Sequence, residues 1–582
     1  MTIFANLQNR IDLTHIPYTD RGSRLMLFRR DHQFYIRMSE RWVKYEAEMG
    51  HYRQRPPMID QLMILDENHS PVNFTVESTP YRVDCHTPLG DFTWCMIDPE
   101  TYLLALPAGR FGMTFEAQVL SGVADRRGGT MQGKSRRNIA YTTNAHLLRN
   151  EIHPAPNGYL RIDLEIKAEN GQAMLFNVTP RLGYNRTIPD PTTAIDRVQN
   201  RWRNWLNAVP PVLDEYRAQY DYAWWVMAAG LMNTRFYFTR EAMSPSKIHY
   251  VGAWHWDQFF HALAYRHVDA QLAEDQLRIF LDHQRADGMI PDAVHDEGVV
   301  DSLTFPIAAD VTKPPLIAWT ALKLYEHSGH RDFIEEVYEP IQRWHNWWVN
   351  YNRDKSGLYE YHHPFSSGLD DCPLWDEGLP VIAPDLNAYL ILQQESLGRI
   401  AEILGDASTA QRYRQGAENL TKLMMEMLWD EEKGFFRSLY QNKPVAALTL
   451  FNLMPLFTGR LSESVNRRLI AHLTDPAKFW TQWPLATVAI DDPSFDAMQM
   501  WRGPTWANIN YLFVDALRRV GQPQLADELA HKTLMMIMQH PDIYEYYNPI
   551  TGERPPKSAP IFGWTSAVFI DLAIQMTRLN GE

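Results

Sequence analysis

YLRIDLEIKAENGQAMLFNV, residues 159–178, alternates apolar and polar side chains from Leu160 to Lys167, whereas AIDRVQNRWRNWLNAV, residues 194–209, repeats its apolar side chains every three or four positions. Strict alternation is typical of a half-buried β-strand, and the longer spacing is typical of an amphipathic helix. Asn170-Gly171 inside the first stretch predicts a hairpin turn to the strand that follows. The chain is therefore expected to change from strands to helices near residue 190.

The same two patterns extend in both directions from this boundary. Further strands are expected at residues 24–30, 33–42, 91–98 and 102–109, and residues 1–190 are predicted to form an antiparallel β-sandwich domain. Helices are expected at residues 194–209, 213–233, 256–268, 272–284, 314–329, 332–351, 385–405, 409–429, 447–459, 463–473, 506–521, 524–540 and 563–576. Alternating short and long connections favour helical hairpins in a ring, an (α/α)6 barrel, for a catalytic domain of residues 191–582, although periodicity alone does not establish the ring.

Composition excludes several classes of partner. A formal net charge of −14 without a basic run argues against nucleic acid and anionic membranes. Three Cys residues match neither a disulfide framework nor a zinc site, which favours reduced thiols. No signal peptide is recognisable, so a cytoplasmic protein is expected. The 19 Trp and 27 Tyr residues suit a carbohydrate partner. No cofactor and no metal at the site are expected, whereas a structural calcium ion and the oligomeric state are left open.

The stretch SSGLDDCPLWDEG, residues 366–378, concentrates four carboxylates in a segment between two helices. Acidic residues in a loop are usually solvated surface. The neighbouring Leu369 and Trp375 argue against that reading for Asp370, because apolar surroundings raise a carboxyl pKa and allow it to donate a proton. This stretch is therefore a candidate source of a general acid.

A second candidate carboxylate, Glu545, lies between tyrosines in YEYYNPITGERPP, residues 544–556. It either activates a water molecule or is an exposed loop residue. In WHWDQFF, residues 254–260, Asp257 is either a helix cap or a hydroxyl acceptor in a pocket. The loop QRADGMIPDAV, residues 284–294, ends a helix and could line a site. Two loop carboxylates on an aromatic-rich helical scaffold favour the acid and base of glycoside cleavage.

Four motifs in the order WHWDQFF, SGLDD, WRGPTWANINY and EYYNPITGE with FGWTS resemble glycoside hydrolase family 63 and its trehalase-like relatives over residues 200–582. These include bacterial α-glucosidases and hydrolases of mannosylglycerate and glucosylglycerate. The resemblance implies an (α/α)6 barrel and hydrolysis with inversion. It assigns Asp370 as general acid and Glu545 as general base, with Asp371 as a neighbour.

The resemblance also implies residues that contact the sugar. Trp256 and Asp257 match a pair that holds the non-reducing-end sugar. The full set of expected substrate contacts is Trp254, Trp256, Asp257, Gln258, Trp375, Trp501, Arg502, Trp506 and Tyr546. The negative charge of Asp376 and Glu377 would repel a carboxylate-bearing substrate unless an Arg compensates. We therefore favour a neutral α-glucoside and keep glycerate glycosides as the alternative.

Two other classes of protein remain open. A sugar phosphorylase would need phosphate ligands where Glu545 stands. A sugar-binding protein without activity would normally lack one of the two carboxylates. A purely structural role has no positive support in the sequence, but fold alone would not exclude it.

Overall fold

The computed structural model describes residues 3–41, 56–133, 137–181 and 183–581. The chain divides into two compact units. The first comprises residues 1–209, 228–233 and 247–251, and the second comprises residues 210–227, 234–246 and 252–582. Within the described residues, no helix combines the length and apolar content that a membrane span requires.

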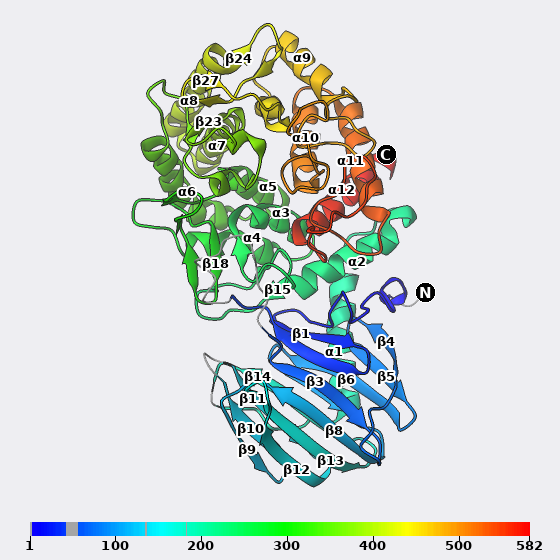
Figure 1. The fold of residues 1–582 in the computed structure, drawn as a ribbon. Helices are drawn as coiled ribbons and strands as arrows, with labels where there is room; N and C mark the ends of the chain where they lie inside the picture. Colours follow the sequence, from blue (N-terminus) through cyan, green and yellow to red (C-terminus); the bar gives the residue numbers. More distant parts are fainter. Residues whose placement is uncertain (1–2, 42–55, 134–136, 182, 582) are drawn as a thin grey trace. The chain divides into compact units, whose positions relative to one another are not determined.

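The first unit contains two antiparallel sheets (Figure 1). One has the strand order β1-β2-β3-β8-β13-β12, and the other β4-β5-β6-β7-β14-β11-β10-β9. The strands are β1 (Leu25–Arg30), β2 (Gln33–Met38), β3 (Ile59–Leu65), β4 (Thr75–Thr79), β5 (Arg82–Thr87), β6 (Gly90–Asp98), β7 (Thr101–Ala105), β8 (Gly109–Ala117), β9 (Ser121–Asp125), β10 (Gly128–Gln132), β11 (Asn138–Thr143), β12 (His146–Pro154), β13 (Leu160–Ala168) and β14 (Ala173–Thr179). The expected antiparallel β-region is confirmed.

Aromatic side chains from both sheets form the core between them. Phe34 of β2 meets Trp94 of β6 at 5.6 Å between ring centroids. Phe115 of β8 meets Phe176 of β14 at 5.6 Å, edge to face. These four side chains are at most 1% exposed, so they supply a large share of the apolar area that holds the sheets together.

The expected hairpin at Asn170-Gly171 is wrong. β13 pairs with β8 and β12 in the six-stranded sheet, whereas β14 pairs with β7 and β11 in the eight-stranded sheet. The turn therefore crosses from one sheet to the other. The alternation in β13 specifies that one face is buried but leaves the partner strand open, and β14 is buried on both faces.

Helix α1 (Pro191–Asn207) begins at Asp190, whose side chain accepts a hydrogen bond from the Thr193 N–H. Its Ala194 packs with Leu103 of β7 and Leu175 of β14. This helix belongs to the first compact unit, although the sequence places the domain boundary before it.

Six elements of the second unit form a closed ring, because each contacts the next in the order α3, α5, α7, η5, α10, α12 and back to α3. The elements of the ring and those around it are α2 (Asp214–Gly230), α3 (His255–Tyr265), α4 (Ala270–Leu281), α5 (Ile317–Ser328), α6 (Arg331–Tyr351), α7 (Pro384–Leu404), α8 (Ala407–Leu428), the 3₁₀ helix η5 (Leu450–Thr458), α9 (Glu463–Leu473), α10 (Ala507–Arg519), α11 (Pro523–Met538) and α12 (Gly563–Gly581). Figure 1 shows the ring in green to red. The expected (α/α)6 architecture is confirmed.

Loops between these helices contain short strands and 3₁₀ turns. They include β17 (Ala253–Trp254), β18 (Ala293–His295), β19 (Gly298–Val300), β20 (Ser302–Leu303), β21 (Ala309–Asp310), β22 (Glu360–Tyr361), η3 (Pro364–Ser367), η4 (Pro373–Trp375), β23 (Val381–Ile382), β24 (Trp429–Asp430), β25 (Phe435–Phe436), β26 (Leu439–Tyr440) and β27 (Lys443–Pro444). They present the side chains described next.

Candidate active site

Four charged side chains of the second unit interact with one another in its interior. They are Asp257 of α3, Asp292 before β18, Lys313 after β21 and Asp370 after η3. Lys313 Nζ lies 2.8 Å from Asp292 Oδ1 and donates to the Phe365 carbonyl at 2.8 Å. A buried ammonium requires such partners, because isolated charge is costly away from water. The cluster thus places one cation among three carboxyl groups.

Asp370 has the features expected of a proton donor. The residue is partly exposed, but its Oδ1 is buried and accepts no hydrogen bond among the described residues. Burial raises the pKa of Asp370 to about 7, and the charges of Asp292 and Asp371 add to the increase while Lys313 opposes it. At neutral pH a substantial fraction of this carboxyl is therefore protonated.

Gly368 and Trp375 shape the loop that presents Asp370. Gly368 ends η3 at φ +74°, and a Cβ at this position would lie 2.4 Å from Cζ2 of Trp256. Glycine is therefore required both by the backbone conformation and by contact with the indole. Trp375 donates its indole N–H to the Leu369 carbonyl at 2.7 Å. The loop is thus braced on both sides of the carboxyl.

Asp371 differs from Asp370 in that both of its carboxylate oxygens accept hydrogen bonds. Its carboxylate accepts hydrogen bonds from the Trp501 N–H at 2.8 Å and from Gln499 Nε2 at 2.6 Å. Arg502 donates to the Asp371 carbonyl at 3.2 Å and pairs through both terminal nitrogens with Asp376 at 2.9 and 2.6 Å. These bonds connect the acidic loop to the segment before α10.

The reading of the acidic stretch as solvated surface fits only part of it. Asp376 and Glu377 are exposed. Asp376 is neutralised by Arg502, and Glu377 accepts from the Ala446 N–H at 2.9 Å. Of the two charges that argue against an anionic substrate, that of Asp376 is therefore paired with a cation from the segment before α10, whereas Glu377 accepts a backbone hydrogen bond.

Glu545 is buried, with 3% of its surface exposed, so the exposed-loop alternative is excluded. Its Oε2 accepts from the Ala559 N–H at 3.2 Å, and its own N–H donates to the Ala559 carbonyl at 2.9 Å. The charge of Glu545 also helps raise the pKa of Asp257. Glu545 therefore belongs to the same electrostatic environment as the cluster around Lys313.

Asp257 lies in the first turn of α3, but it is not the cap. Trp254 occupies the N-cap position, and no side chain caps the helix there. Burial raises the pKa of Asp257 well above its usual range, with Lys313 opposing and Glu545 contributing. A buried carboxyl of this kind is suited to exchanging hydrogen bonds with a ligand hydroxyl.

The aromatic residues next to Asp257 and Glu545 in the sequence form one cluster with rings of the segment before α10. Trp501 and Trp506 lie parallel at 3.8 Å between centroids, and Trp506 meets Tyr546 at 4.7 Å. Trp256 contacts Trp501 at 5.9 Å and Trp564 at 5.3 Å. Trp256, Trp501, Trp506 and Tyr546, all expected from the sequence, are therefore brought together, although each is at most 3% exposed.

Gln258 and Trp254, which the sequence also predicts to contact the substrate, are placed less favourably for that role. The Gln258 side chain is fully buried, donates to the Met243 carbonyl at 2.6 Å and contacts His261 Nδ1 at 3.0 Å. Both polar atoms of the Gln258 amide thus have partners within the protein, and Gln258 is not among the substrate contacts that we propose. Trp254 is partly exposed and packs edge-on against the His295 ring at 5.2 Å.

Sequence reasoning missed Asp292 and Lys313 as functional residues. Asp292 lies in the loop of residues 284–294, for which the sequence favours a lining role without distinguishing any one residue. Lys313 lies in VTKPPL, where a lone Lys has no distinguishing local pattern. Only the proximity of the two side chains in the fold makes them candidates for a functional role. Among the described residues, no group of three or more His, Cys, Asp or Glu side chains is placed to hold a metal.

Comparisons with known proteins agree with this architecture. A mannosylglycerate hydrolase of Thermus thermophilus is 26% identical over 402 residues, which are 56% of this chain and 94% of that protein. The glucosylglycerate hydrolase of Mycolicibacterium hassiacum is 23% identical over 420 residues, 55% of this chain and 92% of that protein.

Two solved structures show the same fold. A GH63 mannosylglycerate hydrolase from Thermus thermophilus, in complex with glucose, matches with a TM-score of 0.51 and 24% identity, over 58% of this chain and 96% of that one. A bacterial glucoamylase complexed with acarbose matches with a TM-score of 0.58 and 12% identity, over 96% of this chain and 92% of that one.

The family model described as "Mannosylglycerate hydrolase MGH1-like glycoside hydrolase domain" matches residues 250–565, more than half of the chain. This range includes Asp257, Asp292, Lys313, Asp370 and Glu545. The chain therefore belongs to the MGH1-like glycoside hydrolases, and it is a GH63-type glycoside hydrolase with an (α/α)6 barrel.

Proposed function

We propose that this protein hydrolyses the α-glycosidic bond of a glycoside whose other half is a small carboxylic acid, as in mannosylglycerate or glucosylglycerate, with inversion at the anomeric carbon. The observation that carries the catalytic part is Asp370, whose Oδ1 is buried without a partner and whose pKa is raised to about 7. A general acid must be protonated at the pH at which it acts.

The two carboxyl groups have complementary roles in this proposal. Asp370 donates its proton to the glycosidic oxygen as the bond from that oxygen to the anomeric carbon breaks. Glu545 accepts a proton from a water molecule that attacks the opposite face of the same carbon. The products are the free sugar in the β configuration and the acid that carried it. An inverting enzyme needs its two carboxyls roughly 6.5–9.5 Å apart to admit this water.

The surrounding groups prepare the site for this chemistry. Asp257 and the Trp256 ring hold the sugar that is transferred. Lys313 limits the rise in the Asp370 pKa that burial and the neighbouring carboxylates cause, so that the acid can also release its proton. The proton reaches the leaving oxygen most readily when the acid's pKa lies near the working pH.

The glycerate-type aglycone is supported by the names of the relatives, which are mannosylglycerate and glucosylglycerate hydrolases. Our preference from the sequence for a neutral α-glucoside relied on uncompensated negative charge near Asp370. Arg502 compensates part of that charge, because it pairs with Asp376. Arg502 is partly exposed, and we propose that it attracts the substrate carboxylate while it remains paired with Asp376.

The test is proton NMR of the protein with 2-O-α-mannosylglycerate, 2-O-α-glucosylglycerate and maltose, in buffer without phosphate. We expect one of the two glycerates to be hydrolysed, with the β-anomer of the sugar appearing first. Preferred cleavage of maltose would instead support a neutral α-glucosidase. Early α-anomer would refute inversion, and dependence on phosphate would indicate a phosphorylase.

Variants separate the two catalytic roles. Asp370→Asn and Glu545→Gln should each lower kcat by at least about a hundredfold, because general acid–base catalysis contributes about 10²–10⁴-fold. Asp371→Asn serves as the neighbouring comparison. Near-normal turnover of Asp370→Asn with a folded protein would refute the assignment of the acid.

A further inference from the structure

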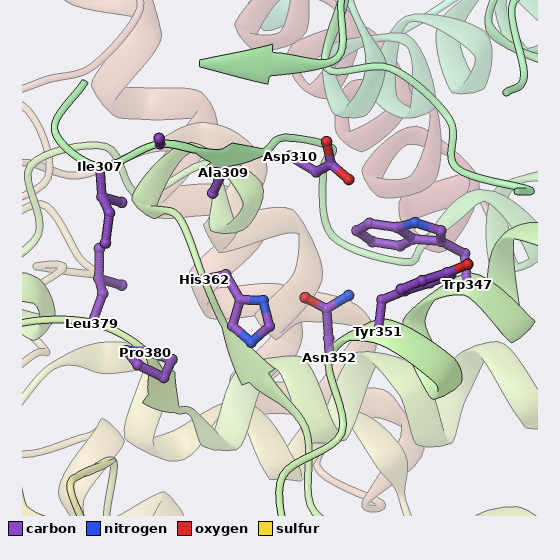
Figure 2. A pocket seen from close by; sticks show the side chains of 10 residues that line it. Ile307, Ala309, Asp310, Trp347, Tyr351, Asn352, His362, Leu379 and Pro380 are labelled. Carbon is purple, nitrogen blue, oxygen red and sulfur yellow. The ribbon is translucent and has the colours of Figure 1, made fainter. Parts of the chain in front are cut away.

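A cavity of about 460 Å³ opens on the helical unit, and its lining includes none of Asp257, Asp292, Lys313 and Asp370 (Figure 2). Residues at the end of α6, in and just before β21, directly after β22 and directly before β23 line it. Its size lies within the roughly 300–1,000 Å³ that small-molecule sites occupy. It has room for one or two sugar rings.

One wall of this cavity is aromatic. Tyr351 is 56% exposed, and the Trp347 ring lies behind it at 5.9 Å with the two planes tilted by 33°. A half-exposed tyrosine supported by a second ring presents a flat apolar face, which suits the C–H face of a pyranose. Ile307, Leu379 and Pro380 add apolar surface on the opposite side (Figure 2).

Hydrogen-bond donors without partners lie in the same wall. Asn352 is 4% exposed, and its Nδ2 is buried with no hydrogen-bond partner in the described part of the chain. Figure 2 shows its amide projecting into the cavity between His362 and Tyr351. The indole nitrogen of Trp347 is likewise buried and has no partner there. A buried donor left unpaired is costly, so a bound hydroxyl acceptor would stabilise this arrangement.

The charges around the cavity favour a neutral ligand. Asp310 is the acidic lining residue, and Arg285 holds it through both terminal nitrogens at 3.0 and 3.2 Å. His362 lies 3.1 Å from Glu360. No Lys or Arg is among the described residues that line the cavity, so a phosphate or carboxylate ligand would lack a cation to pair with.

We propose that this cavity is an accessory binding site for a neutral sugar, separate from the site of hydrolysis. The Tyr351 ring stacks on the pyranose, and Asn352 Nδ2 and Trp347 Nε1 donate to its hydroxyl oxygens. The exposed oxygens of Asp310 accept from other hydroxyls. Binding here does not depend on the proposed bond cleavage, so either assignment can fail without the other.

The experiment uses the full chain with 4-fluorophenylalanine in place of Tyr351 and maltose as the probe. This substitution keeps the ring and adds a local ¹⁹F signal. We expect a saturable ¹⁹F shift with a dissociation constant on the order of 1 mM, a free energy reasonable for one stacked ring and a few hydrogen bonds. The same shift should occur in the Asp370→Asn chain, because the sites are separate.

Two comparisons make the result specific to this cavity. The same fluorinated residue at Met427, which is 41% exposed on α8, should show no saturable shift. Asn352→Leu should weaken maltose binding at the Tyr351 reporter by about three- to tenfold, the loss of one hydrogen bond. If Asn352→Leu does not fold, the proposal is tested by comparing the ¹⁹F shifts that maltose causes at the Tyr351 and Met427 reporters.

Three results would overturn the proposal. The first is no shift at the Tyr351 reporter at maltose concentrations far above 1 mM. The second is an equal shift at both reporters, which indicates general solvent effects. The third is unchanged affinity in a folded Asn352→Leu chain. A Tyr351→Ala chain that binds no maltose at this site should still hydrolyse its substrate at the unaltered rate.

Discussion

Lys313 and Asp292 should tune the pKa of Asp370 in opposite directions, which can be read from the pH dependence of activity. Burial raises the pKa of Asp370 to about 7; the Lys313 charge lowers this pKa, and the Asp292 charge raises it. Asp370 acts protonated, so activity should fall as pH rises through about 7. Lys313→Met should move this basic limb to higher pH, and Asp292→Asn should move it to lower pH.

We take the size of the shift from the typical effect of one neighbouring charge on a carboxyl pKa. A charge within about 4–6 Å typically changes a carboxyl pKa by about 1–3 units, and we take the lower value because both residues share their charge with other groups. If Lys313→Met raises the pKa from about 7 to about 8, the protonated fraction at pH 9 increases from about 1% to about 9%. Relative activity at pH 9 should therefore rise about ninefold.

The assay is kcat/KM of the three proteins between pH 5 and pH 10, each normalised to its own maximum, with about one unit as the expected displacement. Removing one member of a buried ion pair can cost about 3–5 kcal/mol of stability, so thermal unfolding must first show that each variant is folded. Basic limbs that coincide, or that move in the same direction for both variants, would refute this account of how Asp370 is tuned.

Two further predictions concern the loop of the acid and the stability of the barrel. Gly368→Ala should lower kcat at least about tenfold, because the added Cβ would lie 2.4 Å from the Trp256 ring. The left-handed backbone at this position also costs a non-glycine residue about 1–2 kcal/mol. Gly405→Ala is the control: its φ is +91° and nothing lies within 4 Å of the added Cβ, so this variant should lose similar stability but keep its activity. Equal kinetics of these two variants would contradict the steric argument. Arg266 and neighbouring donors hold the pKa of buried Asp571 well below its usual range, so this group contributes stability above about pH 4 that is lost as pH falls. Asp571→Asn should cost about 3–5 kcal/mol near pH 7 and flatten the acid side of the stability profile, as measured by urea unfolding; an unchanged profile would contradict it.

The sequence by itself determined the change from strands to helices near residue 190 and the two motifs that contain Asp370 and Glu545. Periodicity is a local property, because it depends on which face of a helix or strand is buried. It can therefore be read from the sequence without knowing which element packs against that face. The 3₁₀ conformation of η5, where a helix was expected at residues 447–459, is a local departure. Pro455 lies within it and has no N–H to donate to an α-helical bond.

The tertiary structure decided what the local pattern leaves open. The turn at Asn170-Gly171 joins different sheets because strand alternation does not select a partner strand. Lys313 and Asp292 become functional candidates only because the fold brings Lys313 Nζ within 2.8 Å of Asp292 Oδ1. The raised pKa of Asp370 also arises from burial and neighbouring charges contributed by distant segments. Electrostatic tuning depends on distances in space, and those distances are set by the closed barrel.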